Sequence, residues 1–228
     1  MADSLINGTA IGGDTAVYRA YVLPCEYSPG HAPRPFGILT EILQRKKRGG
    51  ATALLVVTRE PLLTGGYSLD STLYDGRTLA PIWSRTSSRS LSADIRFFND
   101  SITWRVQMAG GRTQSGRARV PVGSYFAGGD RVLVRGITNP ALLVGKLIRV
   151  PFVSTPGIEL DAGFEGYMFV APADSFQATG IRTKGAWAIQ LGSGADNTFF
   201  LRRGTRELLG WESAAWEGTC PLRYVRTQ

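Results

Sequence analysis

The side chains best placed to do chemistry in this sequence are arginines in its middle third. Residues 77–149 hold twelve basic against three acidic residues, whereas the rest of the chain is close to neutral. A guanidinium group is planar and binds carboxylate or phosphate through paired hydrogen bonds, so clustered arginines suit an anionic partner. If residues 94–135 form adjacent strands, alternation places five arginines on one sheet face, opposite Trp104, Val106, Ala118, Val120 and Val132. These predicted partner-binding residues are Arg105, Arg117, Arg119, Arg131 and Arg135.

The expected partner of this face is a protein or an anionic membrane surface. Single-stranded nucleic acid binds to aromatic side chains interleaved with cations, and such interleaving is poor here, so nucleic acid is the less favoured partner. Two alternatives remain open, a plain solvated convex face and a coding bias toward arginine. No run of about 18 apolar residues occurs, so no transmembrane segment is expected.

Residues suited to catalysis or metal binding are few. His31 is the single histidine and lies in a Pro/Gly loop, so neither a two-histidine metal site nor a second histidine for a triad is available. Glu159, Asp161 and Glu165 form a small acidic cluster that suits acid/base work in a hollow, or simply a solvated turn. No catalytic residue, metal site or cofactor is assigned.

The two cysteines, Cys25 and Cys220, lie near opposite ends of the chain. If the first and last strands are neighbours, these residues can form a disulfide that closes a long loop. The other interpretation is two free thiols, which the absence of a secretory signal in residues 1–16 favours.

Tryptophans offer a possible apolar pocket. The set predicted to line it is Trp83, Trp104 and Trp187 with Leu143 and Leu147 of a nearby helix, although tryptophans, Trp211 and Trp216 included, more often belong to the core.

The elements that must position these residues are mostly short strands. Apolar side chains alternate with polar ones in residues 102–108, and turn residues 99–100 join that strand to residues 95–98, which predicts a hairpin over residues 94–108. A second hairpin is predicted over residues 37–60. Its tip carries Arg45, Lys46, Lys47 and Arg48, and a basic tip is usually a solvated turn. Further candidates include residues 16–23, 66–74, 131–135, 163–171 and 176–184. About fifteen such strands predict a mainly β fold, a strongly curved antiparallel sheet or open barrel.

One segment departs from this pattern. Asn139 and Pro140 suit the start of a helix, an apolar stripe follows, and Pro151 suits a stop, so a short helix is predicted near residues 140–149, pressed into the concave side of the sheet. The predicted organisation is a flexible leader over residues 1–15 and a single β-rich domain over residues 16–228.

The arrangement resembles the lipoprotein-carrier-like family of bacterial exported proteins, in which a curved sheet wraps around helical segments. The resemblance rests on residues 69–73 leading into residues 78–82, on the helix near 140–149, and on residues 165–178. It implies a non-enzymatic binding role, with the hollow of the sheet as the place for a lipid chain or a partner segment. Against it, the chain has no export signal and less helix than a true carrier.

Together these observations predict a binding or assembly module of the bacterial cell envelope that uses its arginine face for an anionic partner. The alternatives are a carrier of a lipid or small apolar ligand in the hollow, and a barrel enzyme using carboxylate chemistry. The expected location is the periplasm or envelope if a signal was removed, and the cytoplasm otherwise.

Overall fold

A single sheet of fifteen strands organises the part of the chain that the structure describes. The computed structural model describes residues 5–25, 32–153, 164–176, 180–192, 197–214 and 220–227. The first half of the sheet contains β1 (Asp14–Val22), β2 (Arg34–Arg48), β3 (Ala51–Pro61), β4 (Tyr67–Asp75), β5 (Pro81–Ser87), β6 (Leu91–Phe97), β7 (Ser101–Met108) and β8 (Thr113–Arg119). The second half contains β9 (Tyr125–Phe126), β10 (Leu147–Val153), β11 (Phe164–Pro172), β12 (Ala186–Gly192), β13 (Asn197–Arg202), β14 (Leu208–Ser213) and β15 (Leu222–Arg226).

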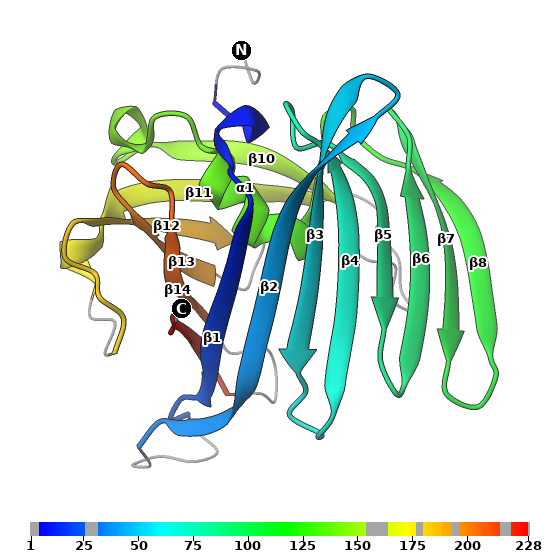
Figure 1. Cartoon of the computed structure of the whole chain (residues 1–228), viewed down its shortest axis with the longest axis horizontal. Helices are drawn as coiled ribbons and strands as arrows, with labels where there is room; N and C mark the ends of the chain where they lie inside the picture. The colour runs from blue at the N-terminus through cyan, green and yellow to red at the C-terminus, as the bar shows by residue number, and fades with distance from the viewer. Residues whose placement is uncertain are drawn as a thin grey trace.

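The strand order shows how the two ends of the chain meet. β1 pairs with β15 in the middle of the sheet, and from that pair the chain meanders outward in sequence order to β8 on one side and in reverse order to β9 on the other. Neighbouring strands are antiparallel except β9 and β10. The sheet is therefore open, with β8 and β9 as its edges, which confirms the predicted curved, mainly β architecture (Figure 1).

The core lies on the concave side, around a short helix. Helix α1 (Asp130–Gly136) lies between the two halves of the sheet (Figure 1). Its Val132 and Val134 belong to one buried cluster with Tyr18 of β1, Leu39 of β2 and Phe199 of β13. Both halves of the sheet therefore bury their apolar faces against one helix, as the alternation of the strands requires.

The predicted helix near residues 140–149 is wrong. Residues Pro140–Leu143 form only a 3-10 turn, η4, and strand β10 begins at Leu147. Gly145 between them has a φ of 74°, in the left-handed region that ends a helix. The apolar stripe does not enter the hollow, since Leu142 and Leu147 are 65% and 68% exposed.

The predicted strand over residues 131–135 is also wrong, because this segment is the middle of α1. Arg131 and Arg135 would share one side of a strand, but they are also four residues apart and so share one helix face, and the apolar Leu133 between them breaks strict alternation. Of the predicted strand 176–184, the described residues 176 and 180–184 lie outside any strand.

The cysteines form a disulfide, so the free-thiol interpretation is wrong. Cys25 follows β1 and Cys220 precedes β15, and their Cα atoms lie 5.3 Å apart. Because β1 and β15 are neighbours, the bond joins the two chain ends beside their own strand pair.

The described part of the leader expected over residues 1–15 is residues 5–15, of which the last two begin β1 and the others lie against the body of the domain. Ile6 and Ile11 are buried. The guanidinium of Arg45 donates hydrogen bonds to the carbonyl oxygens of Gly8, Thr9 and Ile11 at 2.6–2.9 Å. This segment, which includes the 3-10 turn η2 (Gly8–Ala10), becomes one wall of the site described next.

Candidate binding sites

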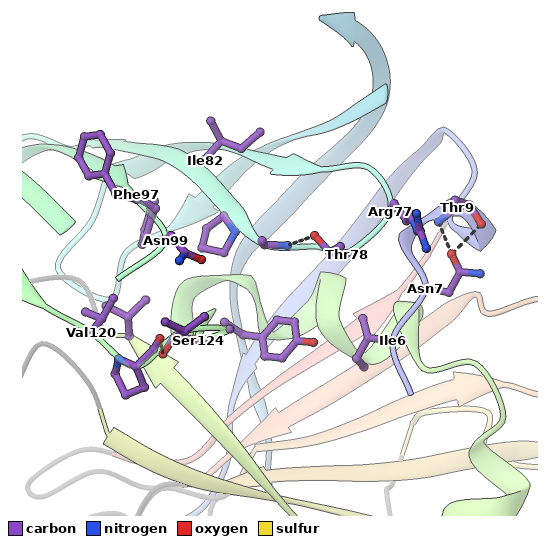
Figure 2. A pocket seen from close by; sticks show the side chains of 18 residues that line it. Ile6, Asn7, Thr9, Arg77, Thr78, Ile82, Phe97, Asn99, Val120 and Ser124 are labelled. Carbon is purple, nitrogen blue, oxygen red and sulfur yellow. Dashed lines mark hydrogen bonds between the residues drawn. The ribbon is translucent and has the colours of Figure 1, made fainter. Parts of the chain in front are cut away.

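A cavity of about 870 Å³ opens where four parts of the chain meet. Its walls are the N-terminal segment, the β4–β5 turn with the start of β5, the β6–β7 turn, and the segment that leads from β8 to β9 (Figure 2). Its lining includes Ile6, Arg77, Ile82, Phe97, Asn99 and Val120.

Local hydrogen bonds fix the β4–β5 wall. The Oδ1 atom of Asp75 accepts hydrogen bonds from the backbone N–H of Arg77 at 2.9 Å and of Thr78 at 2.7 Å. Partial burial alone would raise the pKa of Asp75, but these hydrogen bonds hold it below its ordinary value. Leu79 follows with a φ of 59° and is buried.

Glycines let this wall approach the neighbouring segments. A Cβ atom on Gly8 or Gly136 would lie 2.7 or 2.5 Å from the side chain of Leu79. Glycine at both positions therefore leaves room for the Leu79 side chain, and with it the β4–β5 turn, between the N-terminal segment and α1. Asn7 stiffens the same segment, since its Oδ1 atom accepts the N–H of Thr9 at 2.9 Å (Figure 2).

The lining of this cavity is largely apolar and has one charged member. Ile82, Phe97 and Val120 are among its apolar lining residues, and Phe98 and Val122 also line it while staying 54% and 65% exposed. Arg77 is the charged residue among those that line the cavity. This combination suits a ligand with an apolar body and an anionic end.

The five predicted arginines do not form one surface. Arg105, Arg117 and Arg119 are exposed on one face of β7 and β8, where Arg117 is paired with Thr103 and Arg105 with Ser115. Arg131 and Arg135 instead lie inside the curved sheet on α1, so their predicted place on that outer face is wrong.

The two interior arginines hold a buried carboxylate between them. Glu41 of β2 is 0% exposed, and its Oε1 atom accepts a hydrogen bond from Arg135 Nη1 at 2.5 Å. Its Oε2 atom lies 3.1 Å from Arg131 Nε, as an ion pair without hydrogen-bond geometry. Burial alone would lower the pKa of both arginines, but Glu41 holds both above the ordinary value.

This interior charge cluster continues across the sheet. Arg131 also lies 3.7 Å from Glu60, which accepts a hydrogen bond from the Tyr224 hydroxyl at 2.7 Å. Arg135 donates to the Tyr18 hydroxyl at 3.0 Å and lies 3.9 Å from Asp14. The cluster therefore connects α1 to β1, β2, β3 and β15, which gives it a structural role in placing the helix.

Two smaller polar cavities flank Arg131, of about 200 and 250 Å³. Asp130 lines the larger of the two, and its Oδ2 atom lies 3.4 Å from Asn197 Nδ2. Its Oδ1 atom is buried without a hydrogen-bond partner among the described residues. Burial raises the pKa of Asp130 to about 7, because water no longer solvates the charged form.

We expect Asp130 to make stability fall as pH rises. The pKa of Asp130 is about 7 in the folded state and has the ordinary value of 3.8 in the unfolded state, so the folded state binds the proton more tightly. The free energy of unfolding therefore falls as the pH rises from about 3.8 to about 7. Replacing Asp130 with asparagine should flatten this part of the stability profile and raise the thermal midpoint at about pH 8. Urea unfolding at several pH values checks this, with the exposed Asp174→Asn as control. A wild-type slope retained in Asp130→Asn would contradict the assignment.

The predicted apolar pocket is not assembled. Trp83 lies on the outer face, paired with Arg96, whereas Trp104 packs inside against Gly116 and Trp187 lies under the guanidinium of Arg203 at 4.1 Å. Leu143 is buried and Leu147 exposed. None of the five predicted residues, Trp83, Trp104, Trp187, Leu143 and Leu147, lines the 870 Å³ cavity.

The residues considered for acid/base chemistry give no cluster within the described ranges. The described residues do not include Glu159, Asp161 or His31. They also do not include Trp216, one of the tryptophans expected in the core. Glu165 is exposed and pairs with Arg149 at 3.1 Å. Among the described residues, no group of three or more potential metal ligands occurs, and no helix is long and apolar enough to cross a membrane.

Sequence reasoning missed the cavity and the partner of the interior arginines. The cavity walls come from positions as distant as Ile6 and Val153, and no motif marks them. A signal for Glu41 did exist, because it occupies an inward position between Leu39 and Leu43 in an alternating strand. A carboxylate at such a position must be paired, and arginine is the usual partner.

Comparison with known proteins supports the fold. No family model matches the sequence, and no curated protein matches it. The crystal structure of a β-barrel-like protein of domain of unknown function DUF1849 from Brucella abortus is similar over 95% of this chain and 96% of that chain, with a TM-score of 0.52 and 12% sequence identity. At this identity the similarity concerns the fold alone. This chain therefore has a β-barrel-like fold, and its relation to the lipoprotein-carrier-like family stays a prediction.

Proposed function

We propose that this protein is a non-enzymatic binding domain of the bacterial cell envelope whose large cavity holds an amphipathic, anionic small molecule. The observation that carries the proposal is the 870 Å³ cavity with its apolar lining and single cation. Ligand sites of small molecules are usually concave, mostly apolar and of about 300–1,000 Å³, with a few polar groups that fix orientation.

The expected pose follows from the distribution of the lining residues. An acyl chain or other apolar body contacts Ile82, Phe97 and Val120, while a carboxylate or phosphate lies near the exposed Arg77. Phe98 and Val122 extend the apolar surface into solvent, so the acyl chain of the ligand can contact them before it enters the cavity.

The disulfide supports a location outside the cytoplasm. Bonds of this kind persist in oxidising compartments such as the bacterial periplasm and are rare where glutathione and thioredoxin keep thiols reduced. The bond between Cys25 and Cys220 therefore favours the periplasmic alternative over the cytoplasmic one.

We expect dodecanoate to bind in this cavity. Two substitutions should distinguish the contribution of the apolar body of the ligand from that of its anionic end. Asn99→Trp fills the cavity from the β6–β7 turn and should weaken binding at least about tenfold, or about 1.4 kcal/mol. Arg77→Glu should weaken dodecanoate but leave the neutral dodecanol unaffected. Isothermal titration calorimetry measures both affinities.

Matched controls are available at turns away from the cavity. Ser90→Trp adds the same bulk at the β5–β6 turn, and Arg112→Glu makes the same charge change at the β7–β8 turn. Both should leave dodecanoate binding unchanged. No binding by the wild-type protein, or equal affinity in Asn99→Trp, would overturn this use of the cavity.

A second binding role is favoured by the outer arginines. Arg105, Arg117 and Arg119 share one exposed face, and none of them has a carboxylate partner among the described residues, since Asp94 nearby pairs with Arg85 at 2.7 Å. Uncompensated guanidinium groups on one face suit an acidic partner surface.

A further inference from the structure

Strand β8 leaves one edge of the sheet without a partner among the described residues. It is the last strand in the sheet order, next to β7 alone. Two backbone hydrogen bonds define its pattern, from the N–H of Met108 to the carbonyl of Arg112 and from the N–H of Val120 to the carbonyl of Asp100, both 2.9 Å. These pairs and the register of the ladder determine which residues of β8 face β7.

In an antiparallel pair, hydrogen-bonded positions alternate with positions that point away from the neighbour. The two measured bonds fall on even-numbered residues, so the backbone of Gln114, Gly116 and Ala118 bonds to β7. The N–H and C=O groups that point outward from the free edge therefore belong to Thr113, Ser115, Arg117 and Arg119.

The two faces of this edge differ in chemistry. Arg117 and Arg119 are exposed on the outer face, with Arg105 of β7 beside them. Of the inner positions Gln114, Gly116 and Ala118, the last two are small, and the Trp104 ring lies directly under Gly116. A strand added here would have cations next to its outward side chains and, at Gly116 and Ala118, a small apolar surface next to its inward ones.

We propose that β8 receives an extended acidic segment of a partner protein as an added strand, with Asp or Glu at every second position and apolar residues between them. The inference deepens the second binding role above by naming its partner and its mode. Backbone hydrogen bonds give such additions their affinity, and alternate side chains give them specificity.

Charge decides between this occupant and a second copy of the chain. Residues directly opposite on neighbouring strands have Cβ atoms about 5 Å apart, so like charges there are destabilising. Two β8 strands side by side would bring the arginines of both copies together. An edge lined with cations resists self-pairing and accepts a segment of opposite charge.

The test uses a fluorescein-labelled peptide as long as β8, with glutamate and valine alternating, and a lysine–valine peptide for comparison. Fluorescence anisotropy should show binding of the glutamate peptide alone. Ser115→Pro removes an N–H that points outward, so it should weaken binding at least about tenfold without breaking the β7–β8 ladder. Ser115→Ala keeps this N–H and should bind within about twofold of the wild type.

A charge-matched pair separates attraction by the β8 arginines from attraction by the positive charge of the whole protein. Arg117→Glu/Arg119→Glu should abolish binding, whereas Lys46→Glu/Lys47→Glu at the exposed β2–β3 tip should leave it within about twofold. Hydrogen exchange of the wild-type protein should slow at the amides of Ser115, Arg117 and Arg119 when the peptide is added, which does not depend on any variant folding.

Three results would overturn the inference. The inference is wrong if the glutamate peptide does not bind. Binding that survives Ser115→Pro but not the arginine substitutions means an anionic surface contact without strand addition. If hydrogen exchange at the amides of Ser115, Arg117 and Arg119 is unchanged by the peptide, the contact is likewise one without strand addition. None of these results affects the dodecanoate test, so the two proposals fail separately.

Discussion

Replacing Glu41 with alanine is expected to lower the free energy of unfolding by about 3–5 kcal/mol. Glu41 is fully buried and is the shared counterion of Arg131 and Arg135. Without it, the carboxylates left to these arginines among the described residues are more distant, Asp14 at 3.9 Å from Arg135 and Glu60 at 3.7 Å from Arg131. Removing one member of a buried ion pair leaves the other charged and poorly solvated, which is the large part of this loss.

Urea unfolding followed by circular dichroism measures the change. Glu165→Ala serves as the matched control, because it breaks an exposed ion pair with Arg149 and should change stability by less than about 1 kcal/mol. A Glu41→Ala loss no larger than that of the control would show that the interior cluster does not hold α1 in place.

A triple variant tests whether the loss comes from unpaired charge rather than from lost volume. Replacing Glu41, Arg131 and Arg135 together with leucine or methionine removes all three charges and keeps most of the packing. Apolar replacement of a whole buried ion cluster is often neutral or stabilising. The triple variant should therefore be more stable than Glu41→Ala.

The sequence predicts the strands well where side-chain alternation and turn chemistry agree. In residues 102–108 the apolar positions face inward and the polar ones outward, and the hairpin with β6 follows from the turn at Asn99 and Asp100. The prediction fails for residues 131–135, where two arginines four residues apart fit both one side of a strand and one face of a helix. Only the distant Glu41 decides that case.

The prediction of a helix near residues 140–149 fails for a different reason. Asn139 and Pro140 do begin a turn of helix, as their types predict, but Gly145 takes a positive φ and the chain then joins the sheet as β10. Pairing with β11 outweighs the local preference for helix. Local signals set where the helical turn starts, and tertiary pairing sets where it stops.

The candidate sites depend on which strands are neighbours, and this information is not local. The face shared by Arg105, Arg117 and Arg119 follows from consecutive hairpins, so it was within reach of sequence reasoning. The cavity requires the N-terminal segment to bridge to α1, where Ile6 pairs with Ile137. No periodicity in either segment predicts that contact.

We expect a second large loss of stability when the disulfide between Cys25 and Cys220 is removed, because this bond joins distant parts of the chain. Reduction, or Cys25→Ser/Cys220→Ser, should destabilise the domain by about 5 kcal/mol, because the bond spans 195 residues and the chain-entropy model assigns about that value to so long a loop. The bond limits how far the chain ends separate in the unfolded state, and these ends carry β1 and β15. The loss should therefore lower the stability of the whole domain and leave the native β1–β15 pairing in place.

Urea unfolding with and without dithiothreitol measures this effect. The wild-type protein should lose stability in reductant, and the serine variant should have the same lower stability in both conditions. Far-ultraviolet circular dichroism before the transition should be alike in all samples, since the bond acts on the unfolded state and the sheet of the described residues stays paired. Equal stability of the wild-type and serine proteins without reductant would contradict the prediction, because it would show that the bond does not restrict the unfolded chain.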